Sequence, residues 1–446
     1  MANITVDQAK LVLKSFSALF QNNLISSDLV TWRKHDGEMT DTNRLTVVEQ
    51  VPPRYNVYQT VDGVRDLTAG VQDSVFGSEQ YTLNRIFSSD MGYSDFQKIR
   101  DFNDARESEA LKSAALNLAE RIDAYILGFS AMVSNNWTAG TGTAAVDTFD
   151  DIASGYTRLK EEGNLDQDLR AVLTYGDKQA LASHILYNGQ PGTTGGASGN
   201  ASFTTGEGYF RSGFTGSVAG IPTLFTQQLP TLTTGTRTNG TVTAAGGNVD
   251  YSTVAISTAP GFYLTQTLSL SGLGANATIA DGEVFTIAGV NAYDNRLGAA
   301  LPRLQQFRVV GAATASAGGV ATVRIFPAMI VPGSGTGSAI AVNTAQATVS
   351  AAPGAAAVVT WVGAPNTAIK PRFIMDKSSV IVNTKDLTIP FTGTAARQNL
   401  TKVPLSVRLW KDSTFATGEH RIRFDVALTA NVAADGRRKV TRISSV

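Results

Sequence analysis

The side chains best able to do chemistry in this sequence are three histidines, His35, His184 and His420. They lie far apart in the chain, and none has the close spacing by which two histidines on one helix bind a metal ion. Cysteine is absent, which removes thiolate metal ligands and cysteine nucleophiles. We therefore interpret each histidine as a surface residue or as a hydrogen-bonded core residue, and we expect no metal and no cofactor.

Three glycine-rich segments come close to known catalytic motifs without matching them. The segment 333–338, Gly-Ser-Gly-Thr-Gly-Ser, lacks the Lys-Ser/Thr ending of a phosphate-binding loop, and no amphipathic helix is expected after it. The segments that begin at Gly195 and Gly216 do not fit the G-x-S-x-G pattern of a nucleophilic serine. The first segment is interpreted as a linker.

Acidic pairs and aromatic residues were the remaining candidates for a site. Each acidic pair is expected at a helix end or in the turn after it, where carboxylates cap the helix or are solvated. The aromatic residues of one β-rich region could form a sugar-binding stripe, but their irregular spacing favours core packing. No catalytic residue is predicted. The acidic pairs are Asp150/Asp151, Glu161/Glu162 and Asp166/Asp168, and the aromatic residues are Phe203, Tyr209, Phe210, Phe214 and Phe225.

Composition limits the remaining classes of function. The chain has 446 residues, 43% of them hydrophobic, which is enough for a sizeable core and suggests several domains. Lys+Arg and Asp+Glu both total 37, and no block of five like charges occurs, which argues against a dedicated nucleic-acid binder. No secretion signal or membrane-spanning stretch is recognised, so we expect a cytosolic product without a membrane partner.

Hydrophobic periodicity predicts four helices. The first covers 6–21, where Thr5 and Gln8 form a capping box, and the second is a long amphipathic helix over 101–133. Its polar face is expected to carry Lys112, Asn117, Glu120 and Asp123. A shorter helix is predicted with Asp150/Asp151 as N-cap and Gly163 as its end, and a strand over 171–175 precedes a helix over 177–187.

The second half of the chain is expected to be rich in β-strands. Residues 191–300 carry only eight charges, and alternating Val, Ile and Phe residues favour buried strands over disorder. We predict a β-domain over about 235–362, and a terminal hairpin formed by the strands 405–409 and 421–428. The fold class is therefore α+β with an inserted all-β barrel domain. Between the first two helices, 55–83 is expected to be a long extended loop.

Three segments carry a resemblance to a known family: 280–291, 304–310 and 321–330. Together with the order of the predicted elements, they resemble the major coat proteins of short-tailed double-stranded DNA bacteriophages, which have the HK-ninety-seven-type capsid fold with an inserted β-barrel. The glycine- and threonine-rich segment 231–250 cannot be matched residue by residue. The resemblance implies an N-terminal arm (1–45), an extended loop (46–92), the spine helix of a peripheral domain (93–139), an axial domain (140–232 and 363–400), an inserted barrel (233–362) and a peripheral C-terminal hairpin (401–446).

The resemblance implies a structural protein and not an enzyme. Such a protein self-assembles into hexameric and pentameric capsomers around a scaffolding protein, with a portal protein, in the host bacterial cytoplasm. The resulting virion capsid encloses double-stranded DNA without sequence-specific binding and expands from a procapsid to a mature shell. Two other classes remain open: another β-rich virion component such as a tail or decoration protein, which would have no long spine helix, or a carbohydrate-binding protein or enzyme.

Seven residues are assigned roles in this assembly as hypotheses. Phe16 belongs to an apolar stripe of the first helix, which is too short to be stable alone and should dock on something. Charges of the extended loop are expected to pair across a subunit interface. Glycines at the two ends of the spine helix are expected to act as hinges. The interface residues are Phe16, Arg65, Asp66 and Asp73, and the hinge residues are Gly92, Gly140 and Gly142.

Overall fold

The computed structural model divides the chain into two compact units. Unit 1 consists of 1–48, 80–129 and 380–432, and unit 2 consists of 49–79, 130–379 and 433–446. Each unit is therefore built from segments that are far apart in the sequence. The residues described are 6–35, 46–55, 74–93, 109–139, 146, 148–162, 168–188, 217–218, 221–294, 297–336, 338–389, 394–414, 419–434 and 436–444.

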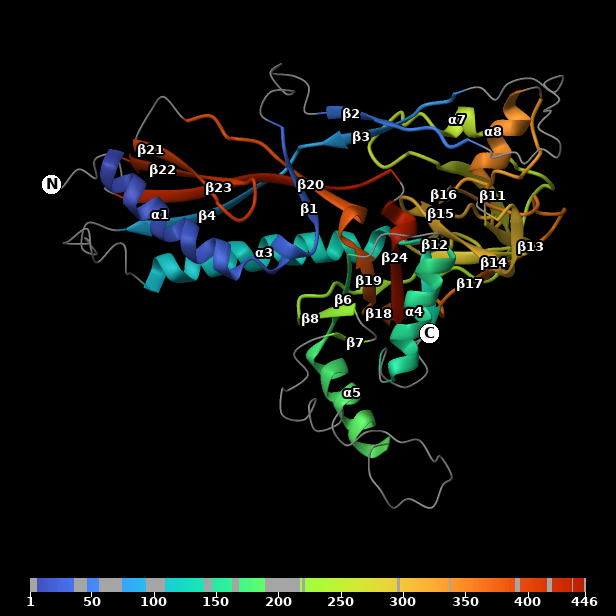
Figure 1. The fold of residues 1–446 in the computed structure, drawn as a ribbon, viewed down its shortest axis with the longest axis horizontal. Coiled ribbons are helices and arrows are strands. Elements are labelled where there is room, and N and C mark those ends of the chain that lie inside the picture. Colours follow the sequence, from blue (N-terminus) through green and yellow to red (C-terminus); the bar gives the residue numbers. More distant parts are fainter. Residues whose placement is uncertain are drawn as a thin grey trace, which may run out of the picture. The chain divides into compact units, whose positions relative to one another are not determined.

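Unit 1 is a sheet with two helices against it (Figure 1). Its strands follow the order β1-β20-β23-β22-β21, and β4 also pairs with the long strand β23. The predicted C-terminal hairpin is confirmed, since β22 and β23 pair antiparallel from Arg408 opposite Asp425 to Thr414 opposite Glu419. The elements are α1 (Val6–Asn23), η1 (Ile25–Asp28), β1 (Thr31–Lys34), β4 (Ile86–Tyr93), α3 (Glu109–Val133), β20 (Val380–Thr384), β21 (Thr394–Asn399), β22 (Ser406–Thr414) and β23 (Glu419–Val432).

The helix α1 forms where periodicity predicted it, and its apolar stripe packs on the sheet of its own unit. Phe16 is fully buried, and its ring stacks on that of Phe424 at a centroid distance of 3.8 Å. The neighbouring Phe20 is also fully buried. The stripe thus docks, as its shortness requires, but on the same chain.

The long helix α3 is also confirmed over 109–133; the predicted first turns, 101–108, lie outside the described residues. One side chain on it differs from expectation. Asp123 was assigned to the polar face, but it is 1% exposed and accepts hydrogen bonds from the backbone N–H groups of Ile25 and Ser26, both at 2.9 Å. Burial raises the pKa of this carboxyl, and the bonds from Ser26 and Ile25 act in the opposite direction. The carboxylate of α3 therefore satisfies the free N–H groups at the start of η1.

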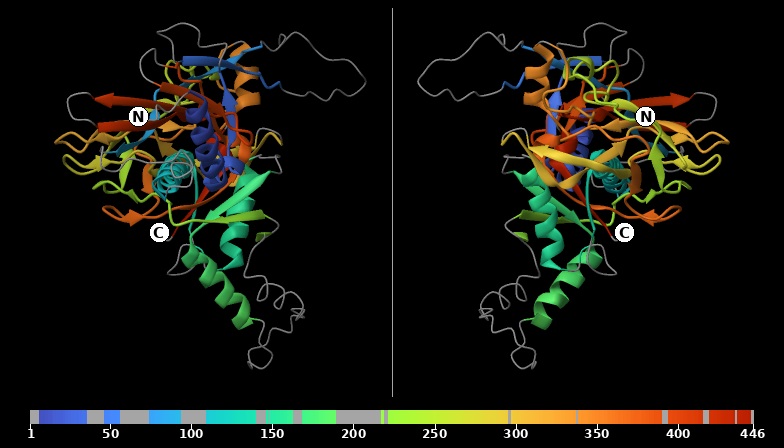
Figure 2. Two further views of the ribbon diagram at one scale, coloured as in Figure 1. Left: turned by 90° about the vertical axis from the view of Figure 1, so that its left-hand side faces the viewer. Right: turned by 90° about the vertical axis from the view of Figure 1, so that its right-hand side faces the viewer.

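Unit 2 contains a six-stranded sheet in the order β5-β24-β19-β6-β8-β7, with α4 packed on it. Ile152 and Leu159 of α4 lie in one buried cluster with Ile374 and Ile443 of the sheet. Figures 1 and 2 both show α5 pointing away from this sheet. The elements are β5 (Asn136–Ala139), α4 (Phe149–Glu161), β6 (Leu169–Leu173), α5 (Tyr175–Asn188), β7 (Ser217–Val218), β8 (Ile221–Phe225), β19 (Arg372–Asp376), η3 (Lys377–Ser379), η4 (Gly436–Lys439) and β24 (Val440–Ser444).

The start of α4 corrects the predicted N-cap. The cap is Thr148, whose side chain accepts from the N–H of Asp151, while Asp151 accepts from the N–H of Thr148. Asp151 is thus the third helical residue of a capping box and not the cap itself. The predicted end, Gly163, lies outside the described residues, and the helix ends at Glu161.

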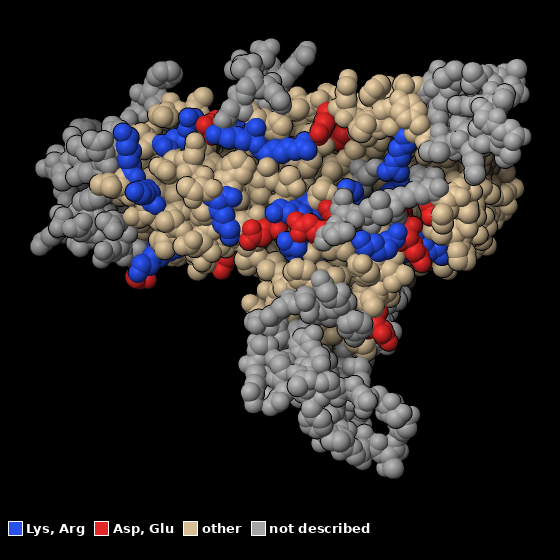
Figure 3. Space-filling view, viewed as in Figure 1, with Lys and Arg blue, Asp and Glu red and all other residues tan. Residues whose placement is uncertain are grey.

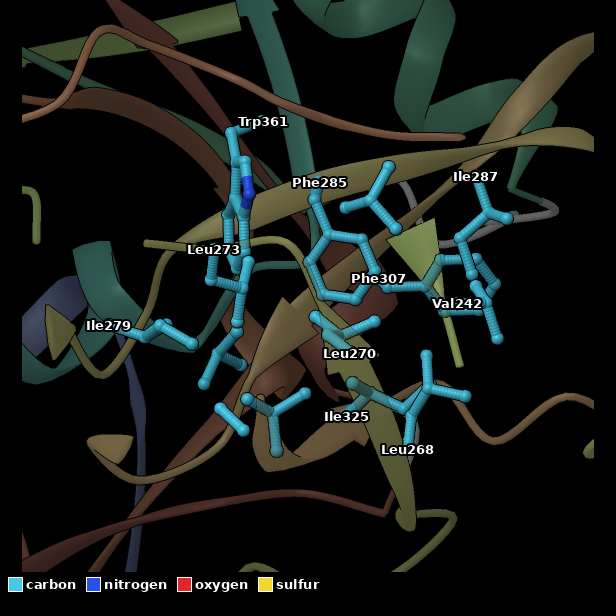
Figure 4. Close-up of a cluster of buried hydrophobic side chains, with 14 of the residues drawn as sticks. Val242, Leu268, Leu270, Leu273, Ile279, Phe285, Ile287, Phe307, Ile325 and Trp361 are labelled. Carbon is cyan, nitrogen blue, oxygen red and sulfur yellow. The ribbon is translucent and has the colours of Figure 1, made fainter. Parts of the chain in front are cut away.

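The second part of unit 2 is a closed barrel, in the order β10-β11-β16-β14-β13-β17, which lies inside the predicted range 233–362. Its centre is filled by Phe285, Phe307, Trp361 and aliphatic residues of facing strands (Figure 4). Its elements and neighbours are β9 (Leu232–Thr233), β10 (Gly240–Val242), α7 (Tyr251–Val254), β11 (Gln266–Ser271), β12 (Thr278–Ile279), β13 (Val284–Asp294), β14 (Ala299–Val309), β15 (Ala313–Thr314), β16 (Ala321–Phe326), α8 (Ser338–Gln346), β17 (Val358–Trp361) and β18 (Ala368–Ile369).

Three short elements add to what the sequence predicted: α8, β2 and β3. The short helix α8 begins at the last residue of the glycine-rich segment 333–338, which was expected to be a linker with no amphipathic helix after it. The side chain of Asn343 holds α8 in place, because it accepts from the N–H of Tyr251 and donates to Asp250. In the extended loop, β2 (Thr46–Val51) pairs with β3 (Gly77–Thr82). No helix among the described residues has both the length and the apolar character needed to cross a membrane.

Candidate functional site: the junction around β14

The neck of the barrel is the first part of a polar junction inside unit 2. Glu283, which is 1% exposed, accepts from the N–H of Gly235 and forms an ion pair with Arg237 at 3.2 Å. Arg237 in turn donates to the carbonyl of Gly363, at the other connection of the barrel, and its guanidinium lies over the ring of Trp361. One buried ion pair therefore holds together the two segments that connect the barrel to the rest of unit 2.

Gly235 has no room for a side chain at this neck. A Cβ atom there would lie 1.9 Å from the carbonyl oxygen of Thr278. The carbonyl of Gly235 also accepts from the N–H of Asn366, so the two connecting segments bond directly to each other. Close backbone approach explains why glycine is needed at this position.

The barrel strand β14 contacts β5 through a glutamine. The side-chain oxygen of Gln306 accepts from the N–H of Trp137 at 2.7 Å, and its side-chain nitrogen donates to the carbonyl of Trp137 at 2.9 Å. Asn135 adds a weaker bond to the backbone carbonyl of Gln306 at 3.4 Å. A single amide thus replaces the two hydrogen bonds that a neighbouring strand would make.

Two buried arginines meet the C-terminal end of α3. Arg308 of β14 donates to the carbonyl of Met132 at 2.6 Å and forms an ion pair with Asp281 at 3.1 Å. Arg442 of β24 donates to the carbonyl of Ser134, and its guanidinium lies 4.7 Å from the centre of the Trp137 ring. The last turn of α3 has no basic residue of its own, so these cations interact with the negative end of the helix dipole from other elements.

Burial shifts the titration of both arginines. It lowers the pKa of Arg308, and the nearby Asp281 acts in the opposite direction. Burial and the charge of Arg308 lower the pKa of Arg442 to about 9, again opposed by Asp281. With a pKa of about 9, Arg442 still carries its charge at neutral pH. The two arginines therefore depend on one carboxylate and on the carbonyls at the end of the helix.

A third arginine joins β14 to the end of α4. Arg303 donates to Glu161 at 2.7 Å and to Glu162 at 2.9 Å. Burial alone would raise the pKa of Glu162, but the charges of Arg303, Arg158 and Arg438 outweigh burial and hold the pKa below its ordinary value. The side chain of Glu162 is only 8% exposed, so the prediction that this acidic pair only caps or is solvated is wrong for Glu162. The pair instead binds the barrel.

The junction has the character of a structural joint. Within the described residues, no three His, Asp or Glu side chains gather in a way that could hold a metal ion. A cavity of about 10 Å³ lined by Arg303, Glu162 and Arg438 has room for about one water molecule.

Elsewhere in the protein, His35 is 9% exposed and its Nε2 lies 2.9 Å from Oδ1 of Asn383, which confirms its interpretation as a hydrogen-bonded core histidine. The side chains of His184 and His420 lie outside the described set.

Of the seven residues assigned to interfaces and hinges, two, Phe16 and Gly92, lie within the described part of the chain. Phe16 is in the core of unit 1, so in this conformation it offers no surface to a neighbouring subunit. Gly92 lies in β4, opposite Arg421 of β23. Arg65, Asp66, Asp73, Gly140 and Gly142 fall outside the described residues.

The residues of the junction were not predicted from the sequence. Arg308 and Gln306 lie in the segment 304–310 that carries the family resemblance, but the backbone groups that they contact, at Met132 and Trp137, are more than a hundred positions away. The alternation of polar and apolar residues showed only that they point out of the barrel. Nothing in one sequence distinguishes an outward residue that meets solvent from one that meets another part of the same unit.

Comparison with known proteins identifies the family. The family model described as "P22 coat protein - gene protein 5" matches residues 81–435. No curated protein sequence matches the chain.

Solved structures of phage proteins also match the chain. The capsid of the cyanophage P-SCSP1u is 10% identical, with 95% of this chain and 88% of that chain covered and a TM-score of 0.42. A chain from Mycobacterium phage Che8 is 11% identical, with 90% and 84% covered and a TM-score of 0.39. The CUS-3 coat protein I-domain is 21% identical, with 28% of this chain and 94% of that chain covered and a TM-score of 0.20.

The family model spans most of the chain, and the 25-residue helix α3 is the element that a tail or decoration protein was expected to lack. The chain belongs to the P22 coat protein family: it is a phage major capsid protein that forms the shell.

Proposed function

We propose that this capsid protein assembles as hexameric and pentameric capsomers around a scaffolding protein, in the host bacterial cytoplasm. A portal protein occupies one position of the shell, and the precursor shell expands into a mature capsid. The observation that carries this proposal is the family match over 81–435. The closed barrel, at the place where the sequence resemblance put an inserted domain, adds support.

The shell encloses double-stranded DNA without reading its sequence. The net charge of the chain is zero, and on the face drawn in Figure 3 many acidic side chains lie beside basic ones. Sequence-independent DNA binding grows with the number of phosphates that Lys and Arg neutralise. A neutral subunit therefore holds its DNA weakly, which suits a container that must later release it.

The protein acts by assembly and by a change of shape, without catalytic turnover. In this proposal the spine helix α3 moves as a rigid body, because its 25 residues contain no proline. The hinges lie at its ends, near Gly92 and around Gly140 and Gly142. The charges of Arg65, Asp66 and Asp73 pair with a neighbouring subunit, and such pairs contribute about 0 to 1 kcal/mol each but recur in every copy.

Electron microscopy of the purified protein tests the assembly. The chain is expressed alone and together with the other head genes of the phage, and each preparation is imaged. We expect closed shells of uniform diameter in the second preparation. Dispersed monomers in both preparations would contradict assembly into a shell.

Gentle heating of precursor shells tests the expansion. The diameter is measured by light scattering, and the subunit mass is measured by mass spectrometry. We expect larger shells of unchanged subunit mass. A single diameter under every condition would contradict the expansion.

A further inference from the structure

Three side chains of β14 reach three elements that follow one another in the chain. Arg308 bonds to the carbonyl of Met132 at the end of α3, Gln306 bonds to Trp137 in β5, and Arg303 bonds to Glu161 and Glu162 at the end of α4. The strand thus contacts β5, which precedes the connection to α4, and also the end of α4, which follows that connection. A strand hydrogen-bonded into a closed barrel is a rigid support for such contacts.

These contacts differ in their access to water. Arg308 is 5% exposed, and its bond to Met132 at the helix end is partly buried. The side chain of Arg303 is 17% exposed, and that of Glu161 is 42% exposed. Water can replace the partners of an exposed ion pair, which makes such a pair much easier to break than a buried one. In the link to α4, water therefore reaches the contact of Arg303 with Glu161 more easily than its contact with Glu162, whose side chain is 8% exposed.

A second link crosses the same connection without the barrel. Arg158 of α4 donates from Nε to Oδ1 of Asn136 in β5 at 3.2 Å. Burial lowers the pKa of Arg158 to about 10, and Glu162 acts in the opposite direction. Glu162 therefore neutralises both arginines, Arg158 from its own helix and Arg303 from the barrel. Loss of Arg303 would leave α4 attached to β5 by Arg158 and by apolar packing.

We propose that β14 is a brace that fixes the end of α4 relative to the end of α3, and that Arg303 is the positioning residue whose ion pairs must break before these elements move apart. The proposal rests on the expansion proposed above, because it assigns the inserted barrel a part in that transition. The barrel, β5 and the end of α3 move as one block. The barrier to expansion then includes the opening of the Arg303 contacts with Glu161 and Glu162.

Hydrogen exchange of the soluble subunit tests the brace without any shell. In Arg303→Gln we expect amides in the last turn of α4 to exchange about tenfold faster, since a hydrogen bond to a charged partner stabilises by about that factor. Amides of β5 and of the barrel strands should be unchanged. Arg324→Gln is the matched control, because Arg324 lies in the barrel strand β16 and contacts Phe262 and Thr265. Equal exchange of α4 in Arg303→Gln and in the wild type would overturn the brace.

Heating of precursor shells tests the link to expansion. Shells of Arg303→Gln should expand at a lower temperature than shells of the wild type or of Arg324→Gln. If Arg303→Gln does not fold, Arg303→Lys replaces it: this variant keeps the charge but loses the paired hydrogen bonds, and should give a smaller shift in the same direction. Equal expansion temperatures would overturn the role of Arg303 in the transition.

The two measurements separate this proposal from the proposed function. If wild-type shells never expand, the expansion and the part of the barrel in it are both wrong, while the exchange of α4 still decides whether the brace exists. If wild-type shells expand and the amides of α4 exchange equally fast in the wild-type and Arg303→Gln subunits, the expansion stands and the brace is wrong.

Discussion

Replacement of Phe16 distinguishes a core residue from an interface residue. Its side chain is fully buried in unit 1 and stacks on Phe424. Truncation of a buried phenylalanine costs about 3 to 5 kcal/mol, and loss of the stacked pair is part of that cost. Domains unfold with a free energy of only about 5 to 15 kcal/mol. We therefore expect Phe16→Ala to remove a large share of the stability of unit 1 in the free subunit.

The assay is urea unfolding of the soluble subunit, followed by circular dichroism. With a free-energy loss of about 4 kcal/mol and a denaturant dependence of about 2 kcal/mol per M, the midpoint should fall by roughly 2 M. The matched control is Leu11→Ala, since Leu11 lies on the same helix but is 50% exposed. Its midpoint should stay within a few tenths of a molar unit of the wild type.

One result would refute this reasoning. If Phe16→Ala keeps the midpoint of the wild type and yet fails to assemble, then Phe16 acts on a neighbouring subunit and the packing on Phe424 contributes little. Phe16→Asp should unfold unit 1, because it places a charge in an apolar core.

Four further measurements test other parts of the structure. Asp425→Asn should destabilise unit 1 at pH 7. Burial would raise the pKa of Asp425, but hydrogen bonds from two arginines and a serine hold this pKa below its ordinary value. The carboxylate therefore stabilises the fold above about pH 4, and the difference in stability from the wild type should vanish as the pH falls through the folded pKa. Glu283→Gln should lower the free energy of unfolding by about 3 kcal/mol in urea, since it leaves Arg237 buried without a countercharge. A fragment over 231–362 should be soluble with a dispersed amide spectrum by NMR, and a random-coil spectrum would contradict an independent barrel. Arg65→Glu should weaken shells at low salt more than at high salt, as measured by urea dissociation, and an effect that does not depend on salt would remove the proposed interface pair.

The elements that could be predicted from the sequence are those with a strong local pattern. The apolar stripe of α1, the course of α3 over 109–133 and the alternation in β22 and β23 depend on residues close in the chain, and all three were found where expected. The N-cap of α4 was predicted at Asp150/Asp151 but is Thr148, and the two acidic residues belong to the first turn of the helix.

Charged residues inside the units could not be predicted in this way. Asp123 falls on the polar side of the periodic pattern, and only the return of the chain at Ile25 and Ser26 gives its carboxylate two buried partners. Arg303 likewise resembles an ordinary surface arginine in the sequence. The free energy that determines such positions comes from partners that the fold brings together, and a local pattern carries no information about them.

The amide contact between Gln306 and Trp137 also favours one register of β14 against β5. It offers one donor and one acceptor at fixed positions, and both are satisfied only when β14 meets β5 in one register. A barrel displaced by one residue along β5 would bury this amide, and the guanidinium of Arg308 beside it, without partners. The free energy of burying these polar groups without hydrogen-bond partners disfavours the displaced register. A purely apolar contact would not distinguish the two registers in this way. The register of the barrel against β5 within unit 2 is therefore fixed by one side-chain amide.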